Sequence, residues 1–343
     1  MATEIRNVLT SELARRNISC EAGPQRTKVT INLVGNSLGG LYMRFAVKEL
    51  LHGGRNKKLV LPSYPNLAID LDTFATTVSP YLGCKHMSWL GENIFPVPPK
   101  IEAAVAFALG LSVFDLFRGT ETVGYMSKLD AFLLPLGSFA RRVALSNAYG
   151  TDFLVGHTSG LFLSSTSQVP HRLVPSVDAR GEEGREKAHV SAIYETSRTC
   201  DPLGTAATYP SGSTGNPEDS FKVTDCQASQ NLDGLGWKKI VVDMRRVLGT
   251  FGGGKNQEEK DLLVIRSKAR LQRDYTSQEL NAELRLPAGG VGVGMPLPRA
   301  HNMAVANQKN AKYTEAYQAG RPVMDWLAKE IVLGGGGGRE KVD

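Results

Sequence analysis

The stretch "VTINLVGNSLGGLYMRFAVKELL", from Val29 to Leu51, constrains the fold of this chain more than any other segment. Apolar and polar residues alternate up to Val34, which is the period of a strand, and apolar residues then recur at helical spacing from Leu41 onward. Between the two patterns lies Gly35-Asn36-Ser37-Leu38-Gly39, in which glycines flank a serine. The pattern predicts a strand that turns sharply into a helix, with the serine at the turn.

Such a turn is the setting of a nucleophile elbow, G-x-S-x-G, in which the serine Oγ is held above the edge of a sheet. The expected nucleophile is Ser37, and Gly35 and Gly39 are the expected elbow glycines. The backbone N–H of Leu38, the next residue, is the expected oxyanion donor. The alternative is a plain strand–helix turn whose glycines only allow close packing of the helix.

Composition excludes several other classes of protein. With 343 residues, 41% of them hydrophobic and 22% charged, the chain is expected to be soluble and globular. The net charge is +6, but the basic residues are scattered and not interleaved with aromatic ones, so nucleic-acid binding is not predicted. Four widely spaced cysteines argue against a zinc site or a disulfide scaffold. They are Cys20, Cys84, Cys200 and Cys226.

The ends of the chain bear on its expected location. The first residues mix acids and bases without an apolar run, so no secretory signal is predicted, and no apolar run is long enough to span a bilayer. We therefore expect a cytoplasmic protein, with peripheral contact at membranes or lipid droplets as a further option. No cofactor or metal is expected, and the oligomeric state is left open.

Strand patterns separated by helical patterns predict an α/β fold with a mostly parallel sheet flanked by helices. Besides the strand before Ser37, strands are expected within 66–83, at 141–148 and at 236–247. Helices are expected over 5–16, 99–117 and 325–333.

These elements predict one domain in two stretches of sequence. Residues 1–175 form the expected core, with the elbow and an acid-bearing loop, and residues 236–333 complete the same domain with a histidine loop. The unusually apolar segment 99–117 is a candidate cap or lid, the alternative being a buried core helix.

Three other segments have a different character. Residues 176–235 are polar and lack apolar periodicity, so they are predicted to be a largely disordered insertion. Residues 249–298 begin and end in glycine-rich tracts and are expected to be a second insertion, and residues 334–343 a flexible tail.

An activated serine needs a histidine base and an acid that orients the histidine. In α/β-hydrolases these follow in the order serine, acid, histidine. Asp152 directly follows the third expected strand, and His301 lies on a loop before the closing helix. Asp115 and Asp130 are weaker acid candidates because each lies in or beside a helical stretch. The other histidines, which fit the order or spacing less well, are His52, His86, His157, His171 and His189.

Several segments together resemble a known family. "INLVGNSLGGLYMRFAVKEL" is similar to the elbow of the lipase-like serine esterases of eukaryotes, which have the α/β-hydrolase fold. The resemblance continues in "LDTFATTVSPYLG", "FARRVALSNAYGTDFLVGHTS", "AHNMAVAN" and "GRPVMDWLAKEI". It covers most of 1–175, then 236–247 and 299–332. It implies that Ser37, Asp152 and His301 form a catalytic triad.

The chain departs from the family pattern at three points. Tyr81 and Asn36 stand where the family has histidines. Only 36 residues precede Ser37, and they contain no His-Gly loop, which in the family supplies part of the oxyanion hole. The chain therefore resembles a hydrolase that lacks its N-terminal strands.

The expected function is hydrolysis of carboxylic esters, foremost lipid esters, through an acyl-enzyme on Ser37. Two alternatives stay open at this point. One is a catalytically impaired hydrolase remnant that acts as a binding or scaffold protein, and the other is an acyltransferase that uses the same triad.

Overall fold

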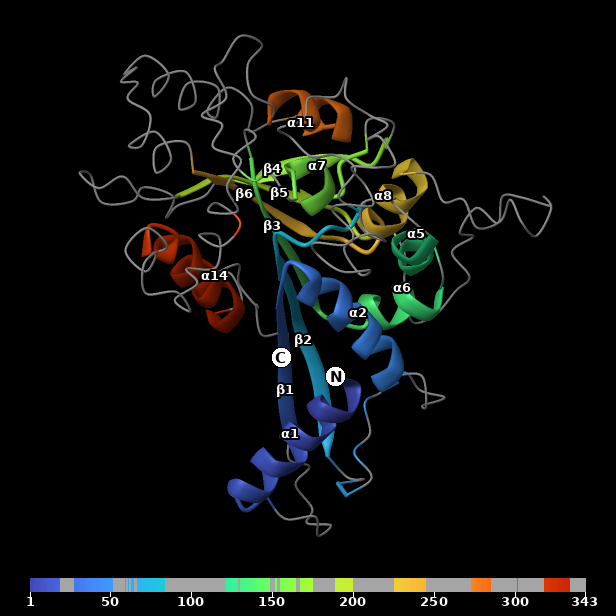
Figure 1. Ribbon diagram of the computed structural model, residues 1–343, viewed down its shortest axis with the longest axis vertical. Helices are drawn as coiled ribbons and strands as arrows, with labels where there is room; N and C mark the ends of the chain where they lie inside the picture. The colour runs from blue at the N-terminus through green and yellow to red at the C-terminus, as the bar shows by residue number, and fades with distance from the viewer. Residues whose placement is uncertain are drawn as a thin grey trace, which may run out of the picture.

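The fold was taken from a computed structural model (Figure 1). It describes residues 1–18, 28–51, 59, 61, 63–64, 67–83, 121–128, 130–148, 152, 155–164, 167–174, 189–199, 225–244, 273–284, 301 and 318–333. The candidate cap or lid at 99–117 and the expected tail at 334–343 lie outside these residues.

The described strands form one seven-stranded sheet in the order β1-β2-β3-β6-β5-β4-β7. The pairs β1–β2, β2–β3 and β3–β6 are parallel. The pairs β6–β5, β5–β4 and β4–β7 are antiparallel. The strands are β1 (Lys28–Asn36), β2 (Ala68–Thr77), β3 (Arg141–Asn147), β4 (His171–Val174), β5 (His189–Thr196), β6 (Lys238–Asp243) and β7 (Asp274–Tyr275). The α/β class expected from the sequence is therefore present.

Helices cover both faces of the sheet (Figure 1). The described helices are α1 (Ala2–Arg15), α2 (Leu38–Leu51), α5 (Glu121–Lys128), α6 (Asp130–Gly137), α7 (His157–Gly160), α8 (Asp225–Asp233), α11 (Ser277–Glu283) and α14 (Arg321–Leu333). In Figure 1, α14 lies on one side of the sheet, and α2, α5, α6 and α8 lie on the other.

Alternation along the central strands explains this three-layer arrangement. In β3, Val143 and Leu145 pack in the cluster that contains Val323 and Leu327 of α14. Ala144, between them, packs in the opposite cluster with residues of α2 and α8. Successive strand residues point to opposite faces, so a strand that is apolar on both faces needs a helix on each.

The prediction that residues 176–235 are a largely disordered insertion is wrong for two stretches. Residues 189–196 form β5, which pairs with β6 on one side and β4 on the other. Residues 225–233 form α8, whose Leu232 is fully buried in the main core. Both stretches are part of the folded core. Within 249–298, β7 pairs with β4, and α11 follows it with a capping box at Thr276 and Glu279.

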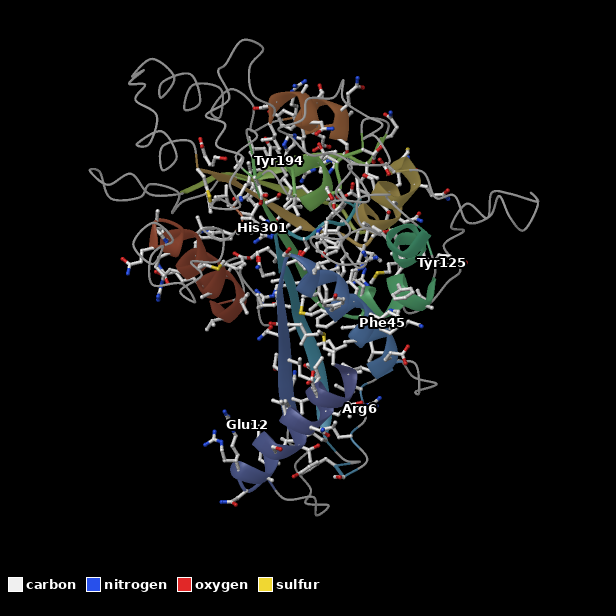
Figure 2. The ribbon with its side chains drawn as sticks, in the orientation of Figure 1. Arg6, Glu12, Phe45, Tyr125, Tyr194 and His301 are labelled. Carbon is white, nitrogen blue, oxygen red and sulfur yellow. The ribbon has the colours of Figure 1, made fainter. Side chains whose placement is uncertain are left out.

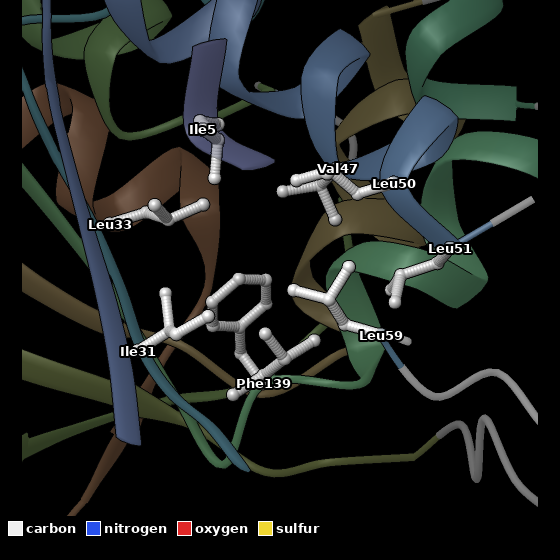
Figure 3. A pocket seen from close by; sticks show the side chains of 9 residues that line it. Ile5, Ile31, Leu33, Val47, Leu50, Leu51, Leu59 and Phe139 are labelled. Carbon is white, nitrogen blue, oxygen red and sulfur yellow. The ribbon is translucent and has the colours of Figure 1, made fainter. Parts of the chain in front are cut away.

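A small apolar cavity lies between α1, β1 and α2 (Figure 3). Its free volume of about 10 Å³ is at the lower limit for a single water molecule. The lining residues, which carry no polar side chains, are Ile5, Ile31, Leu33, Val47, Leu50, Leu51, Leu59, Leu71 and Phe139. The cavity is therefore a packing gap in the core rather than a ligand site.

No helix in the part of the chain that the structure describes is long and apolar enough to cross a bilayer.

Candidate active site

Ser37 lies at the junction predicted from the sequence. It follows the last residue of β1 and precedes the first residue of α2, and its φ of 53° is in the left-handed region. A residue with a side chain adopts this conformation only where its surroundings hold it there. Its backbone N–H donates to the Thr77 carbonyl at 2.8 Å, and its carbonyl accepts from Gly40 at 3.1 Å. These bonds hold the strained turn against β2.

The glycines of the turn differ in how much space a side chain would have at each. A Cβ on Gly35 would lie 2.6 Å from Met43 Cε and 2.8 Å from the backbone of Gly39 and of Gly40. A Cβ on Gly40 would lie 2.1 Å from Ser79 Oγ, whereas a Cβ on Gly39 would meet nothing within 4 Å. A side chain would therefore clash at Gly35 and at Gly40, which the motif does not include, whereas Gly39 has room for one.

The loop after β2 is strained beside the turn. Val78 has a φ of 44° and is completely buried, and its N–H donates to the Leu145 carbonyl at 2.7 Å. A β-branched residue in the left-handed region is a marked outlier, and such strain clusters at functional sites. The preceding residue, Thr77, donates from Oγ1 to Asn36 Oδ1 at 2.9 Å. A valine gives no sequence signal for this conformation.

Asp152 follows β3 and accepts hydrogen bonds from residues on either side of it in the sequence. Its Oδ2 accepts from Asn147 Nδ2 at 3.2 Å, and its Oδ1 accepts from the backbone N–H of Val155 at 3.1 Å. The residue is only 2% exposed. Asn147 is the last residue of β3, so the strand end itself supplies a donor to the carboxylate.

His301 contacts Asp152 although the two are 149 residues apart in the sequence. The distance from His301 Nδ1 to Asp152 Oδ2 is 2.9 Å. An ionised carboxylate only accepts hydrogen bonds, so in such a pair the ring donates from Nδ1. In the view of Figure 2, His301 lies at the level where β1 ends. The contact joins the two residues that chain order selected as acid and base candidates.

The ends of the parallel strands place Ser37 and Asp152 at one edge of the sheet. Asn36 of β1 is in register with Thr77 of β2, and Thr77 is in register with Leu145 of β3. Neighbouring strands are about 4.8 Å apart, so β1 and β3 are separated by about 10 Å. Open α/β sheets have their functional groups at this carboxyl edge.

The other candidates lie elsewhere. Asp130 begins α6, His157 begins α7 and His189 begins β5. His171 begins β4 and belongs to a separate, buried cluster. Asp115, His52 and His86 lie outside the described residues.

That separate cluster joins α8, β6 and β4. Lys239 Nζ lies 2.6 Å from Asp233 Oδ1 and 2.9 Å from His171 Nε2. Ser229 Oγ lies 3.4 Å from Asp233 Oδ2, and the Lys239 ammonium sits 3.9 Å from the centre of the Phe162 ring. Lys239 pairs with Ala144, three residues before the end of β3, which places it about 10 Å from the carboxyl edge.

Burial governs the ionisation of this cluster. It raises the pKa of Asp233 to about 6 and lowers the pKa of Lys239 to about 8, and the pairing of the two opposes both shifts only in part. Burial, reinforced by the Lys239 charge, lowers the pKa of His171 to about 2. His171 is therefore neutral at physiological pH and accepts from the lysine.

Among the described residues, no group of three or more His, Cys, Asp or Glu side chains could hold a metal ion, and Cys226 is a free thiol. Comparison with protein families, with curated proteins and with solved structures finds no significant match.

Proposed function

We propose that this chain is a serine hydrolase of the α/β-hydrolase fold that cleaves carboxylic esters through Ser37, His301 and Asp152. The observation that carries the proposal is the 2.9 Å contact between His301 and Asp152. It joins two residues that chain order selected, on the same sheet edge as a serine in a left-handed turn. The resemblance of several segments to lipase-like serine esterases supports the same reaction.

In the proposed first step, Ser37 Oγ attacks the ester carbonyl carbon while its proton passes to His301 Nε2. The tetrahedral intermediate then collapses as the bond to the alcohol oxygen breaks, and His301 returns the proton to that oxygen. Water repeats the sequence on the acyl-enzyme and releases the acid. Asp152 stays ionised throughout, holds the proton on Nδ1 and stabilises the imidazolium.

The negative charge on the carbonyl oxygen needs donors. Leu38 is the first residue of α2, and the first N–H groups of a helix have no partner within the helix. The Leu38 N–H, at the positive end of the helix dipole, is the proposed donor. Loss of one such donor typically reduces turnover by about a hundred- to a thousandfold.

An apolar stripe beside the nucleophile supports a lipid ester as substrate. From Leu38, next to Ser37, it runs along α2 to Tyr42 and Phe45, which are 48% and 51% exposed. Phe45 packs against Phe132 of α6 at 5.8 Å, and Lys48 caps both rings at about 5 Å. Exposed aromatic side chains on the helix that follows Ser37 suit the acyl chain of a lipid or the surface that contains it.

The test is labelling with a fluorophosphonate probe, which reacts with activated serines. The unchanged chain should be labelled at Ser37, and the Ser37→Ala chain should not. Hydrolysis of long-chain esters in preference to short-chain ones would support the lipid assignment. Labelling that persists in Ser37→Ala, or occurs at another serine, would overturn the proposal.

A second candidate is a binding or scaffold protein derived from such a hydrolase. One observation favours it: among the described strands, β1 pairs with β2 alone, so its other edge offers backbone groups for a partner strand. This candidate predicts a folded chain with no labelling at Ser37 and no ester turnover. An acyltransferase would instead be labelled and would transfer the acyl group to an alcohol faster than to water.

A further inference from the structure

Asp152 Oδ2 accepts a hydrogen bond from Asn147 as well as from His301. Asn147 Nδ2 lies 3.2 Å from Oδ2, and His301 Nδ1 lies 2.9 Å from the same atom. The second carboxylate oxygen is occupied by the N–H of Val155. Donors on both oxygens restrict the plane of the carboxylate and its distance to the histidine.

The position of Asn147 makes its contribution different from that of the histidine. Asn147 ends β3, is 1% exposed and is in register with Val242 of β6, so it is anchored in the middle of the sheet. The N–H of Ala148 donates to the Val242 carbonyl at 3.0 Å, which ties down the next residue as well. The amide therefore transmits the rigid position of the strand to a carboxylate that lies five residues further along the chain.

We propose that Asn147 is a positioning residue of the active site, which orients the Asp152 carboxylate toward His301. The inference rests on the proposed function and adds a residue that the triad pattern does not contain. The amide donates to the charged form of the carboxylate and keeps it in place while the histidine ring changes charge. A charge-assisted bond of this kind between buried groups is stronger than a neutral one.

The main test is a double-mutant cycle on the rate of fluorophosphonate labelling at Ser37. Asn147→Leu, which keeps the size of the side chain but removes its donors, should slow labelling by about ten- to a hundredfold. In an Asp152→Asn background the same change should have almost no further effect, because there is no carboxylate left to orient. An equal slowing in both backgrounds, or none in the unchanged background, would overturn the inference.

Asn281→Leu is a matched control. Asn281 of α11 is 5% exposed, its Oδ1 accepts from Thr158 at 2.7 Å and its Nδ2 donates to the Leu163 carbonyl at 3.3 Å. The control removes a buried amide of similar burial that does not contact Asp152 in the structure. It should lower the melting temperature but leave the labelling rate within about twofold.

A second measurement does not depend on hydrolase activity. The proton on His301 Nδ1, observed by NMR, reports the bond to Asp152, and its exchange with water should speed up in Asn147→Leu but not in Asn281→Leu. If no chain is labelled but this difference is seen, the proposed function fails and the positioning role stands. If labelling occurs at Ser37 and neither the cycle nor the exchange shows coupling, the positioning role fails alone. Should Asn147→Leu not fold, Asn147→Ser takes its place in both measurements.

Discussion

Two buried aspartates, Asp152 and Asp233, each lie near a histidine but in different parts of the sheet. Asp152 is beyond the carboxyl end of β3, and its Oδ2 lies 2.9 Å from His301 Nδ1. Asp233 ends α8, and its carboxylate contacts both Lys239, which lies about 10 Å from the carboxyl edge, and His171. All three side chains are completely or almost completely buried. The residue types are alike, and location decides what they can do.

The energetics of the inner cluster show why it stays structural. The pKa of Asp233 rises and that of Lys239 falls, so the loss of hydration exceeds what the pair regains by attraction. Buried ion pairs often contribute no net stability, yet removing one partner is costly because the other charge is left uncompensated. The cluster joins α8, β6 and β4, and its side chains are shielded from solvent.

The largest expected effect separates the two aspartates by activity. Asp152→Asn should reduce ester turnover by about three to four powers of ten, because the amide no longer keeps the proton on His301 Nδ1. Turnover per folded molecule should be nearly unchanged in Asp233→Asn. Steady-state kinetics on both variants, corrected for the folded fraction, check this. A similar loss of turnover in both would show that the two aspartates do not differ in their role in activity.

For stability, the change at Asp233 should have the larger effect of the two. Asp233→Asn leaves the Lys239 charge buried without a counterion and should lower the free energy of unfolding by about 3–5 kcal/mol. The double variant Asp233→Leu with Lys239→Met removes both charges and should recover most of that loss. Urea unfolding followed by circular dichroism measures both. No recovery in the double variant would mean that the pair is net stabilising.

Two glycines of the Ser37 turn should differ in their tolerance of a side chain. Gly40→Ala forces a methyl group against Ser79 and should cost about 1–3 kcal/mol and slow labelling at Ser37. Gly39→Ala meets no atom within 4 Å and should be neutral or stabilise α2 by up to about 1 kcal/mol. Thermal unfolding of the pair compares them directly. Equal destabilisation would show that the turn is packed differently.

The last prediction is a pH dependence of stability from His171, which appears only at acidic pH. Its pKa in the folded chain, about 2, is below its ordinary value of 6.5, so the stability that it contributes is present above pH 6.5 and is lost as the pH falls. Asp233 has a raised pKa, so its contribution to stability increases as the pH falls below about 6. In the unchanged chain the two pH-dependent contributions, from His171 and from Asp233, offset each other. His171→Asn should therefore gain stability relative to it, by about 1.4 kcal/mol per unit from pH 6 toward pH 4.

That prediction is checked by unfolding both chains at several pH values and plotting the difference in free energy. A difference that stays constant between pH 6 and pH 4 would mean that His171 takes up a proton in the folded chain. Solvent would then reach the His171 side chain more readily than its burial indicates.

Much of the parallel part of the fold could be predicted from the sequence, because local patterns there agree with the tertiary structure. The strand before Ser37 alternates, the helix after it has helical spacing, and the strands at 141–147 and 238–243 are apolar runs. The antiparallel part was harder to predict. β5 has a bulge between Val190 and Ala192, which breaks the period of two, and β7 has only two residues. Neither pattern is visible without the neighbouring strands.

The same limit applies to the candidate site. Chain order sufficed to select Asp152 and His301, because each follows or precedes a recognisable element. Gly40, Val78 and Asn147 could not be found in this way. Their importance comes from a close approach of α2 to the loop after β2, from an unusual backbone angle and from a contact across a loop. These are properties of three-dimensional packing, to which residue type alone gives no guide.

The strand order has a consequence for the order in which the chain can fold. β5 is synthesised before β6 but lies beyond it, so β5 cannot join the sheet until residues 238–243 have been made. Until then β3 ends the growing parallel sheet, and β4 and β5 can form only an isolated antiparallel pair. Joining these pieces requires contacts between residues distant in sequence, which form slowly. On the ribosome, the emerging chain exposes an apolar strand edge for as long as this takes, and that interval is when a chaperone would be needed most.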